Sequence, residues 1–304
     1  MQLTLGPVPY YWSADRLHAF YRAAADWPLD TVYLGENVCS KRRAFSLDDW
    51  IGLGRELTQA GKQVILSSLA LVEARSEMGV VRRLCENGEF RVEANDMGAV
   101  QLASAAGAPF VGGSTLNVYN PRTLAVLRRA GMVRWVPSVE MPGRMISENL
   151  QGLGDPDLEV EVQGFGPLPL AWSARCFTAR AADRPKDQCG FRCLEHPSGL
   201  PMGTRDGDAF LRINGTQLQS GRWLHLLDAL EDIRAAGANA VRLSPWGEDM
   251  AGVVRAYAAA LAGEAGADRP IPGLAPEACC DGYWFGEAGM ARVARNARFQ
   301  EELT

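Results

Sequence analysis

The stretch Thr31-Val-Tyr-Leu-Gly35, followed by the segment Ser46–Ala60, contains the unit that decides the fold. The first run is short and apolar, as expected for a strand that is buried on both faces. In the second, Ser46 stands at the position of a helix N-cap, and Leu47 and Trp50 begin an apolar pattern with helical spacing. A buried strand followed by an amphipathic helix is the unit of a parallel sheet.

The same unit recurs along the chain, which has 304 residues. Strict alternation predicts a parallel sheet, and eight units can close into a single TIM-like (β/α)8 barrel. The alternative is an open doubly wound sheet, but no glycine-rich turn after the first strand supports a dinucleotide site. The predicted strands are Leu3–Val8, Thr31–Gly35, Gln63–Ser68, Arg91–Asn95, Pro109–Gly113, Val133–Pro137, Leu158–Gly164 and Ala240–Ser244, and the predicted helices are Ala14–Ala25, Ser46–Ala60, Leu71–Cys85, Met97–Ala106, Pro121–Ala130, Arg144–Leu150 and Asp249–Ala262.

Residues 165–228, between the seventh and eighth predicted strands, interrupt this regular pattern. They include Pro167, Pro169, three cysteines and a predicted hairpin across Gln219-Ser220-Gly221. A connection of this length ordinarily carries function or substructure of its own. We therefore expect one barrel domain over residues 1–304, with a cysteine-bearing insertion at residues 165–228.

Composition and charge set the broad class of the protein. The chain is 47% hydrophobic, with a net charge of −5 and a pI of about 5.4. An acidic chain lacks the basic footprint of a nucleic-acid-binding protein, so no nucleic-acid partner is expected. No secretory signal or long apolar stretch is visible, so we expect a soluble, cytoplasmic protein that is not transmembrane.

Four of the seven cysteines are candidates for a metal centre. Loops that follow the strands of a βα-barrel gather at one face, and this predicts that Cys39, Cys176, Cys189 and Cys193 meet there. Four thiolates suit structural zinc or an iron–sulfur cluster. Their long, unequal spacing favours a [4Fe–4S] cluster, while zinc and unrelated core cysteines remain alternatives. The other three, Cys85, Cys279 and Cys280, are expected not to bind metal.

Polar residues near the carboxyl ends of the strands are candidates for a substrate pocket beside the cysteines. Arg242 stands inside an apolar strand, so its side chain must reach either a wet barrel mouth or a buried partner. One hypothesis is that Arg242, with Lys41, Arg42 or Arg175, binds an anionic small molecule, such as a carboxylate that donates oxygen. The alternative is an internal salt bridge of Arg242 with Glu140 or Glu36. The candidate catalytic residues are Glu36, Asn117, Glu140 and Arg242, and the candidate anion-binding residues are Lys41, Arg42, Arg175 and Arg242.

Several segments, spread over residues 6–284, resemble the UbiV branch of the U32 peptidase-like family. The branch's four cluster-ligand positions are filled here by Cys39, Cys176, Cys189 and Cys193, whereas the stretch His196–Arg212 matches poorly. The matching segments are Val32–Arg43, Asn87–Phe90, Pro169–Arg180, Asp183–Cys189 and Cys280–Trp284.

This resemblance implies a [4Fe–4S] subunit of an O2-independent hydroxylation system in anaerobic ubiquinone biosynthesis. It implies a heterodimer with a UbiU-like U32 protein, a UbiT-like lipid-carrier protein and a prenylated quinone precursor as substrate. The alternatives are a U32-type peptidase and a non-catalytic partner subunit with a structural four-cysteine metal site. The aromatic segment Tyr283-Trp284-Phe285 is expected either at a partner surface or as a plug at the end of the barrel.

Overall fold

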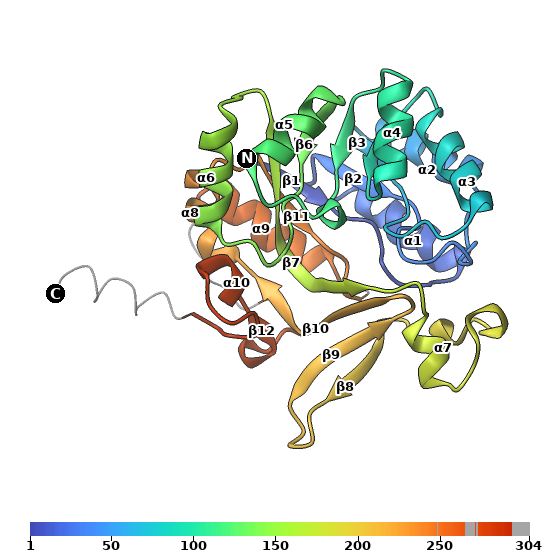
Figure 1. The fold of residues 1–304 in the computed structure, drawn as a ribbon. Coiled ribbons are helices and arrows are strands. Elements are labelled where there is room, and N and C mark those ends of the chain that lie inside the picture. Colours follow the sequence, from blue (N-terminus) through green and yellow to red (C-terminus); the bar gives the residue numbers. More distant parts are fainter. Residues whose placement is uncertain (248, 265–270, 272, 294–304) are drawn as a thin grey trace.

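Parallel strands close into a barrel, and helices surround it (Figure 1). The computed structural model describes residues 1–247, 249–264, 271 and 273–293. Within them eight strands form the barrel in the order β11-β1-β2-β3-β4-β5-β6-β7, and the pairing of β11 with β7 closes it. This confirms the predicted (β/α)8 fold and excludes the open sheet. The barrel strands are β1 (Gln2–Leu5), β2 (Thr31–Leu34), β3 (Gln63–Ser67), β4 (Arg91–Ala94), β5 (Phe110–Gly112), β6 (Met132–Trp135), β7 (Glu159–Trp172) and β11 (Ala240–Leu243).

The helices around the barrel match the predicted segments to within three residues at each end, with two larger differences. The third helix begins at Arg75 instead of Leu71, because the Glu77 carboxylate accepts the backbone N–H groups of Glu73 and Ala74 and so fixes its start. A short helix before β11 was not predicted, since six residues are too few to show a helical period. The helices around the barrel are α1 (Ala14–Ala25), α2 (Leu47–Gln59), α3 (Arg75–Cys85), α4 (Met97–Ala105), α5 (Pro121–Arg129), α6 (Gly143–Leu153), α8 (Leu230–Ala235) and α9 (Ala251–Leu261).

The helix caps follow from local sequence. Ser46 caps α2 as predicted: its hydroxyl accepts the N–H of Asp49 at 3.2 Å, and its own N–H donates to the Asp49 carboxylate at 2.8 Å. Asn120 caps α5, and Pro121 occupies its first turn. These local bonds satisfy backbone N–H groups that the helix leaves without partners.

Strand β7 continues past the barrel and forms a ribbon below it (Figure 1). It pairs antiparallel with β10 (Gln217–His225), which pairs with β9 (Ala209–Asn214), and β8 (Leu200–Gly203) completes the ribbon. The predicted hairpin across Gln219-Ser220-Gly221 is wrong, because these residues lie within β10. The turn between β9 and β10 is Gly215-Thr216, flanked by the paired residues Asn214 and Gln217, and Gly215 at its first position has a φ of +66°.

The interior of the barrel holds a buried layer of charged side chains. Arg242 donates to Glu161 and to Glu93, in each case at 2.7 Å, and Arg134 donates to Glu161 at 3.1 Å. All four residues are buried. The expected salt bridge of Arg242 therefore exists, but the predicted partner, Glu140 or Glu36, is wrong. Glu93 and Glu161 were overlooked in the sequence, although each interrupts an apolar strand.

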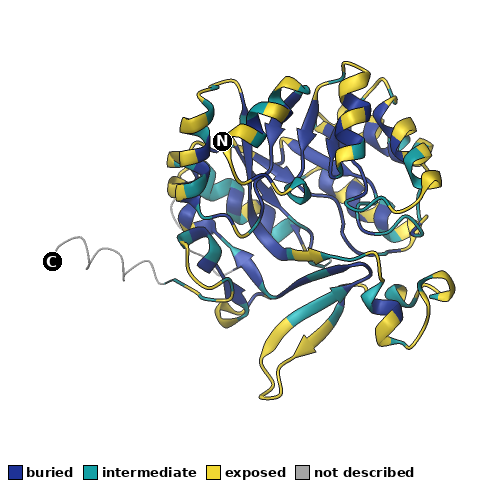
Figure 2. Cartoon of the chain, in the orientation of Figure 1, coloured by how far each residue is buried: buried dark blue, intermediate teal, exposed yellow. Residues whose placement is uncertain are grey.

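Apolar packing surrounds this polar interior. Figure 2 shows buried strands and inner helix faces, with exposed outer helix faces and an exposed β8–β9 hairpin. Trp284, in α10 (Gly282–Phe285), is buried against Gly143 at the start of α6, where a Cβ atom would lie 2.6 Å from the indole ring. Trp284 thus packs onto its own barrel. No helix among the described residues has the length and apolar character needed to cross a membrane.

Candidate metal centre

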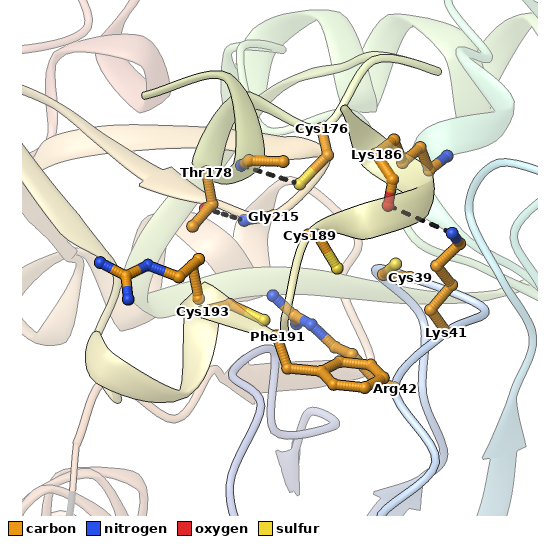
Figure 3. Close-up of a pocket in the computed structure, with 12 residues that line it drawn as sticks. Cys39, Lys41, Arg42, Cys176, Thr178, Lys186, Cys189, Phe191, Cys193 and Gly215 are labelled. Atoms are coloured by element: carbon orange, nitrogen blue, oxygen red, sulfur yellow. Dashed lines mark hydrogen bonds between the residues drawn. The ribbon is translucent and has the colours of Figure 1, made fainter. Parts of the chain in front are cut away.

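Four cysteines from separate parts of the chain line one pocket of about 370 Å³. Cys39 follows β2, Cys176 precedes the short helix α7 (Phe177–Ala181), and Cys189 and Cys193 lie in the turns after it. In Figure 3 their sulfur atoms point toward a shared space. The structure therefore brings together the four cysteines that the expected barrel topology placed at one face.

The loop that bears Cys39 is held by a carboxylate. Oε1 of Glu36 accepts the backbone N–H of Val38 at 2.8 Å and that of Cys39 at 3.0 Å. The carbonyl of Cys39 in turn accepts the N–H of Arg42 at 3.0 Å, which closes a tight turn. Glu36, a predicted catalytic candidate, here fixes the position of a predicted ligand.

The other three cysteines are positioned by short helical turns. Sγ of Cys176 accepts the N–H of Ala179 at 3.4 Å, so this thiol caps α7. Between Cys189 and Cys193, Gly190 and Phe191 both have positive φ values, of 58° and 53°. This left-handed reversal, uncommon for a phenylalanine, brings the two thiols to the same side of the turn.

Cationic side chains lie around the thiols. Arg42 lines the pocket with its side chain only 1% exposed, and it donates to the Pro9 carbonyl and to Oδ1 of Asn214, each at 2.8 Å. Lys41 also lines the pocket and donates to Asp187 at 2.8 Å. Arg175 is exposed and does not line it. Of the predicted basic residues, Lys41 and Arg42 are therefore at the thiols.

The environment of the thiols suits metal binding. Burial raises the pKa of the Cys39 and Cys193 thiols, and Arg42 opposes this effect at both. Without metal these thiols are protonated at neutral pH, and a metal must displace their protons. In the described part of the chain no three His, Cys, Asp or Glu side chains stand close enough to hold one metal ion. Four thiols around a pocket, with two cations beside them, are a donor set that fits an anionic iron–sulfur cluster.

The remaining cysteines lie elsewhere. Cys85 is buried at the end of α3, 3.8 Å from the Ala99 carbonyl. Cys279 and Cys280 form the buried strand β12 (Cys279–Cys280), which pairs with β10. None of the three lines the pocket of the other four.

The predicted catalytic candidates do not share one site. Arg242 lines a hollow at the barrel mouth, whereas Glu36 lines a separate small hollow beside Arg42. Asn117 and Glu140 line a third hollow, where the Tyr119 hydroxyl donates to Glu140. The structure thus separates the four residues into three groups.

A chain of buried amide side chains connects the thiol pocket to the barrel mouth. Asn214, which accepts from Arg42, donates to Oε1 of Gln217 at 3.0 Å, and Gln219 donates to the same oxygen at 2.9 Å. Gln217 and Gln219 line the barrel-mouth hollow. Sequence reasoning missed these residues, and the only available signal was the clustering of amide residues in Asn214–Gln219.

The match to a family model extends over most of the chain. Residues 12–270 match the model of peptidase family U32. The chain belongs to peptidase family U32. This match confirms the predicted resemblance at the level of the U32 family.

Solved structures with similar folds share little sequence with this U32 chain. One described as a U32 peptidase is 11% identical, covers 82% of this chain and 94% of its own, and has a TM-score of 0.46. A dihydropteroate synthase from Thermus thermophilus is 12% identical, with coverages of 86% and 92% and a TM-score of 0.42. A glycerol uptake operon antiterminator regulatory protein from Listeria monocytogenes is 10% identical, with coverages of 81% and 94% and a TM-score of 0.41.

Proposed function

We propose that this U32 protein is a UbiV-type [4Fe–4S] subunit of an O2-independent hydroxylation system in anaerobic ubiquinone biosynthesis. The observation that carries the proposal is the meeting of Cys39, Cys176, Cys189 and Cys193 around one pocket with Arg42 and Lys41. A set of four cysteines suits such a cluster, and neighbouring cations stabilise its negative charge.

The residues of the chain have separate roles in this proposal. The four cysteines would hold the cluster, which when bound supplies one-electron chemistry. Glu36 holds the Cys39 turn in place, and Arg42 sets the charge beside the thiols. The resemblance adds the partners: a UbiU-like U32 protein in a heterodimer, a UbiT-like lipid carrier and a prenylated quinone precursor, all meeting in the cytoplasm.

The deciding experiment is purification without air. The protein should be brown, absorb near ~410 nm and bleach on reduction, with iron and sulfide in equal amounts. Co-expression with a UbiU-like protein should yield a stable complex that restores anaerobic quinone synthesis. A colourless, zinc-loaded protein that supports this synthesis would overturn the cluster assignment and favour a structural four-cysteine zinc site.

Membership of a family named for peptidases favours a second candidate, a U32-type peptidase. Under this function the protein would cleave a casein or peptide-library substrate after removal of iron. The Cys39→Ala variant would cleave the same substrates. Turnover that survives both treatments would favour the peptidase over the hydroxylase subunit.

A further inference from the structure

The guanidinium of Arg42, at the thiol pocket, is held through two of its three nitrogens. Nη1 donates to the carbonyl of Pro9 and Nη2 donates to Oδ1 of Asn214, each at 2.8 Å. Nη1 also lies 3.8 Å from the carboxylate of Glu36. Because a guanidinium is planar and rigid, these contacts fix the direction of the third nitrogen, Nε, as well.

Nε of Arg42 is the nitrogen that these contacts do not use. It is buried, and it has no hydrogen-bond partner within the described part of the chain. The side chain is only 1% exposed, so bulk water does not reach this N–H group. A buried donor without an acceptor costs free energy, and here the cost falls at a pocket that four thiols line.

Cys193 is the thiol to which Nε can donate. In Figure 3 the guanidinium of Arg42 points toward the sulfur of Cys193. Arg42 opposes the rise in the pKa of Cys193 through its charge and through a directed side-chain interaction, whereas it acts on the pKa of Cys39 through charge alone. A neutral thiol is a weak acceptor, but a metal-bound thiolate is a charged one. The acceptor for Nε is therefore completed when Cys193 loses its proton to bind metal.

A second arginine at the same pocket lacks these features. Arg192 also lines the pocket, but its side chain is 42% exposed and forms an ion pair with Glu195. None of its nitrogens is a buried donor without a partner in the described ranges. Water screens an exposed charge of this kind. The pair Arg42 and Arg192 thus allows a directed, buried N–H group to be compared with a positive charge that is merely close.

We propose that Nε of Arg42 donates a hydrogen bond to the Cys193 thiolate of the bound cluster and raises the reduction potential of that cluster. Arg42 is then a positioning residue of the metal centre, in place of the anion-binding role expected from sequence. A hydrogen bond to a cluster sulfur offsets its negative charge, which increases on reduction, so the bond favours the reduced state. The inference rests on the proposed function for the nature of the metal group.

The test is pulsed EPR of the reduced protein, purified without air from cells fed arginine labelled with 15N at Nε only. The wild-type protein should show a magnetic coupling between the cluster and one 15N nucleus. Arg42→Lys, which keeps the positive charge, should abolish the coupling and lower the reduction potential by about 59 mV, the equivalent of a tenfold change in the equilibrium for one electron. Arg192→Lys should leave the coupling and the potential unchanged.

The outcomes separate this hydrogen bond from the proposed function. Wild-type protein that holds a full cluster but shows no 15N coupling would overturn the hydrogen bond alone. A coupling that persists in Arg42→Lys, or one that is lost in Arg192→Lys, would overturn the assignment to Arg42. Protein without any cluster would refute the proposed function, and the hydrogen bond with it. Because the wild-type spectrum needs no variant, it decides the question even where Arg42→Lys fails to fold.

Discussion

Nε of Arg242 lies 2.7 Å from Oε1 of Glu161, and the two residues stand on neighbouring strands of the barrel, both buried. The same carboxylate accepts from Thr4 at 2.6 Å and from Arg134 at 3.1 Å. Burial tends to raise the pKa of Glu161, but Arg242 and Arg134 outweigh it, so the pKa is lowered and the group is charged at neutral pH. The barrel therefore closes around ion pairs.

Breaking this pair should destabilise the fold. Arg242→Met leaves Glu93 without its buried counter-charge and leaves Glu161 with Arg134 alone, so it should lower the free energy of unfolding by about 3–5 kcal/mol. The control is Arg22→Met, which breaks an exposed pair with Glu56 and should cost less than about 1 kcal/mol. Urea unfolding followed by circular dichroism measures both. Equal losses in the two variants would contradict the structural role of Arg242.

The seven cysteines should divide into two groups. Alanine at Cys39, Cys176, Cys189 or Cys193 should remove most bound iron and sulfide, because the cluster loses one of four ligands. Variants with alanine at Cys85, Cys279 or Cys280 should retain the iron. Because Cys280 is fully buried, Cys280→Ala should lower the stability of the fold without loss of iron. Loss of iron in Cys280→Ala together with its retention in Cys39→Ala would show that the assignment is wrong.

The turn at Gly215 should couple backbone strain to the metal centre. A Cβ atom there would lie 2.7 Å from Nη2 of Arg42, and the residue has a φ of +66°. Gly215→Ala should lower stability by about 1–3 kcal/mol and also lower the iron content or shift the reduction potential, because Arg42 must move.

Gly207→Ala is the matched control for Gly215→Ala. Gly207 also has a positive φ, of +92°, but no atom lies within 4 Å of its added Cβ. It should therefore show the strain without any change in iron content or potential. If both variants lose iron equally, the Arg42 contact is not the cause.

His225 should make the fold sensitive to mild acid. Burial, with a smaller contribution from Arg292, lowers its pKa to about 4, against about 6.5 in the unfolded chain. Between these values the unfolded chain binds a proton that the folded chain does not, so the free energy of unfolding falls as pH decreases. By about pH 5 this loss should reach at most about 2 kcal/mol.

The check is urea unfolding at about pH 7 and about pH 5. His225→Gln should lose less stability over this interval than the wild-type protein, since the titrating group is absent while the carboxylates are unchanged. His225 lies 3.1 Å from the Tyr257 hydroxyl, so the glutamine can keep a polar contact. An identical loss in both proteins would exclude His225 as the source.

Much of the barrel was predictable because its signals are local. Each strand is a short apolar run and each longer helix has its own period, so the eight strands and the Ser46 cap were found from sequence. The ribbon was harder to predict. Gln219-Ser220-Gly221 has the composition of a turn, yet pairing with β7 and β9 makes it strand, and only the distant partners decide this.

The site shows the same division between local and distant information. Cys39, Cys176, Cys189 and Cys193 were found because barrel topology places their loops together. The partners of Arg242 were not found from sequence. Strand register and barrel stagger decide which of several buried glutamates faces an arginine. Asn214 and Gln217 were missed for the same reason: their roles come from residues far away in the sequence.

The Thr216 hydroxyl donates to the Val38 carbonyl at 2.7 Å, next to Cys39. Asn214, a partner of Arg42, lies two residues before Thr216, at the end of β9. During synthesis, all four cysteines leave the ribosome before these two residues do. A nascent chain stopped just after Cys193 would contain all four of these cysteines. Val38, next to Cys39, would lack its hydrogen bond from Thr216, and Arg42 would lack Asn214, one of its two acceptors. Cofactor delivery to this protein should therefore follow, and not precede, the synthesis of residues 214–216.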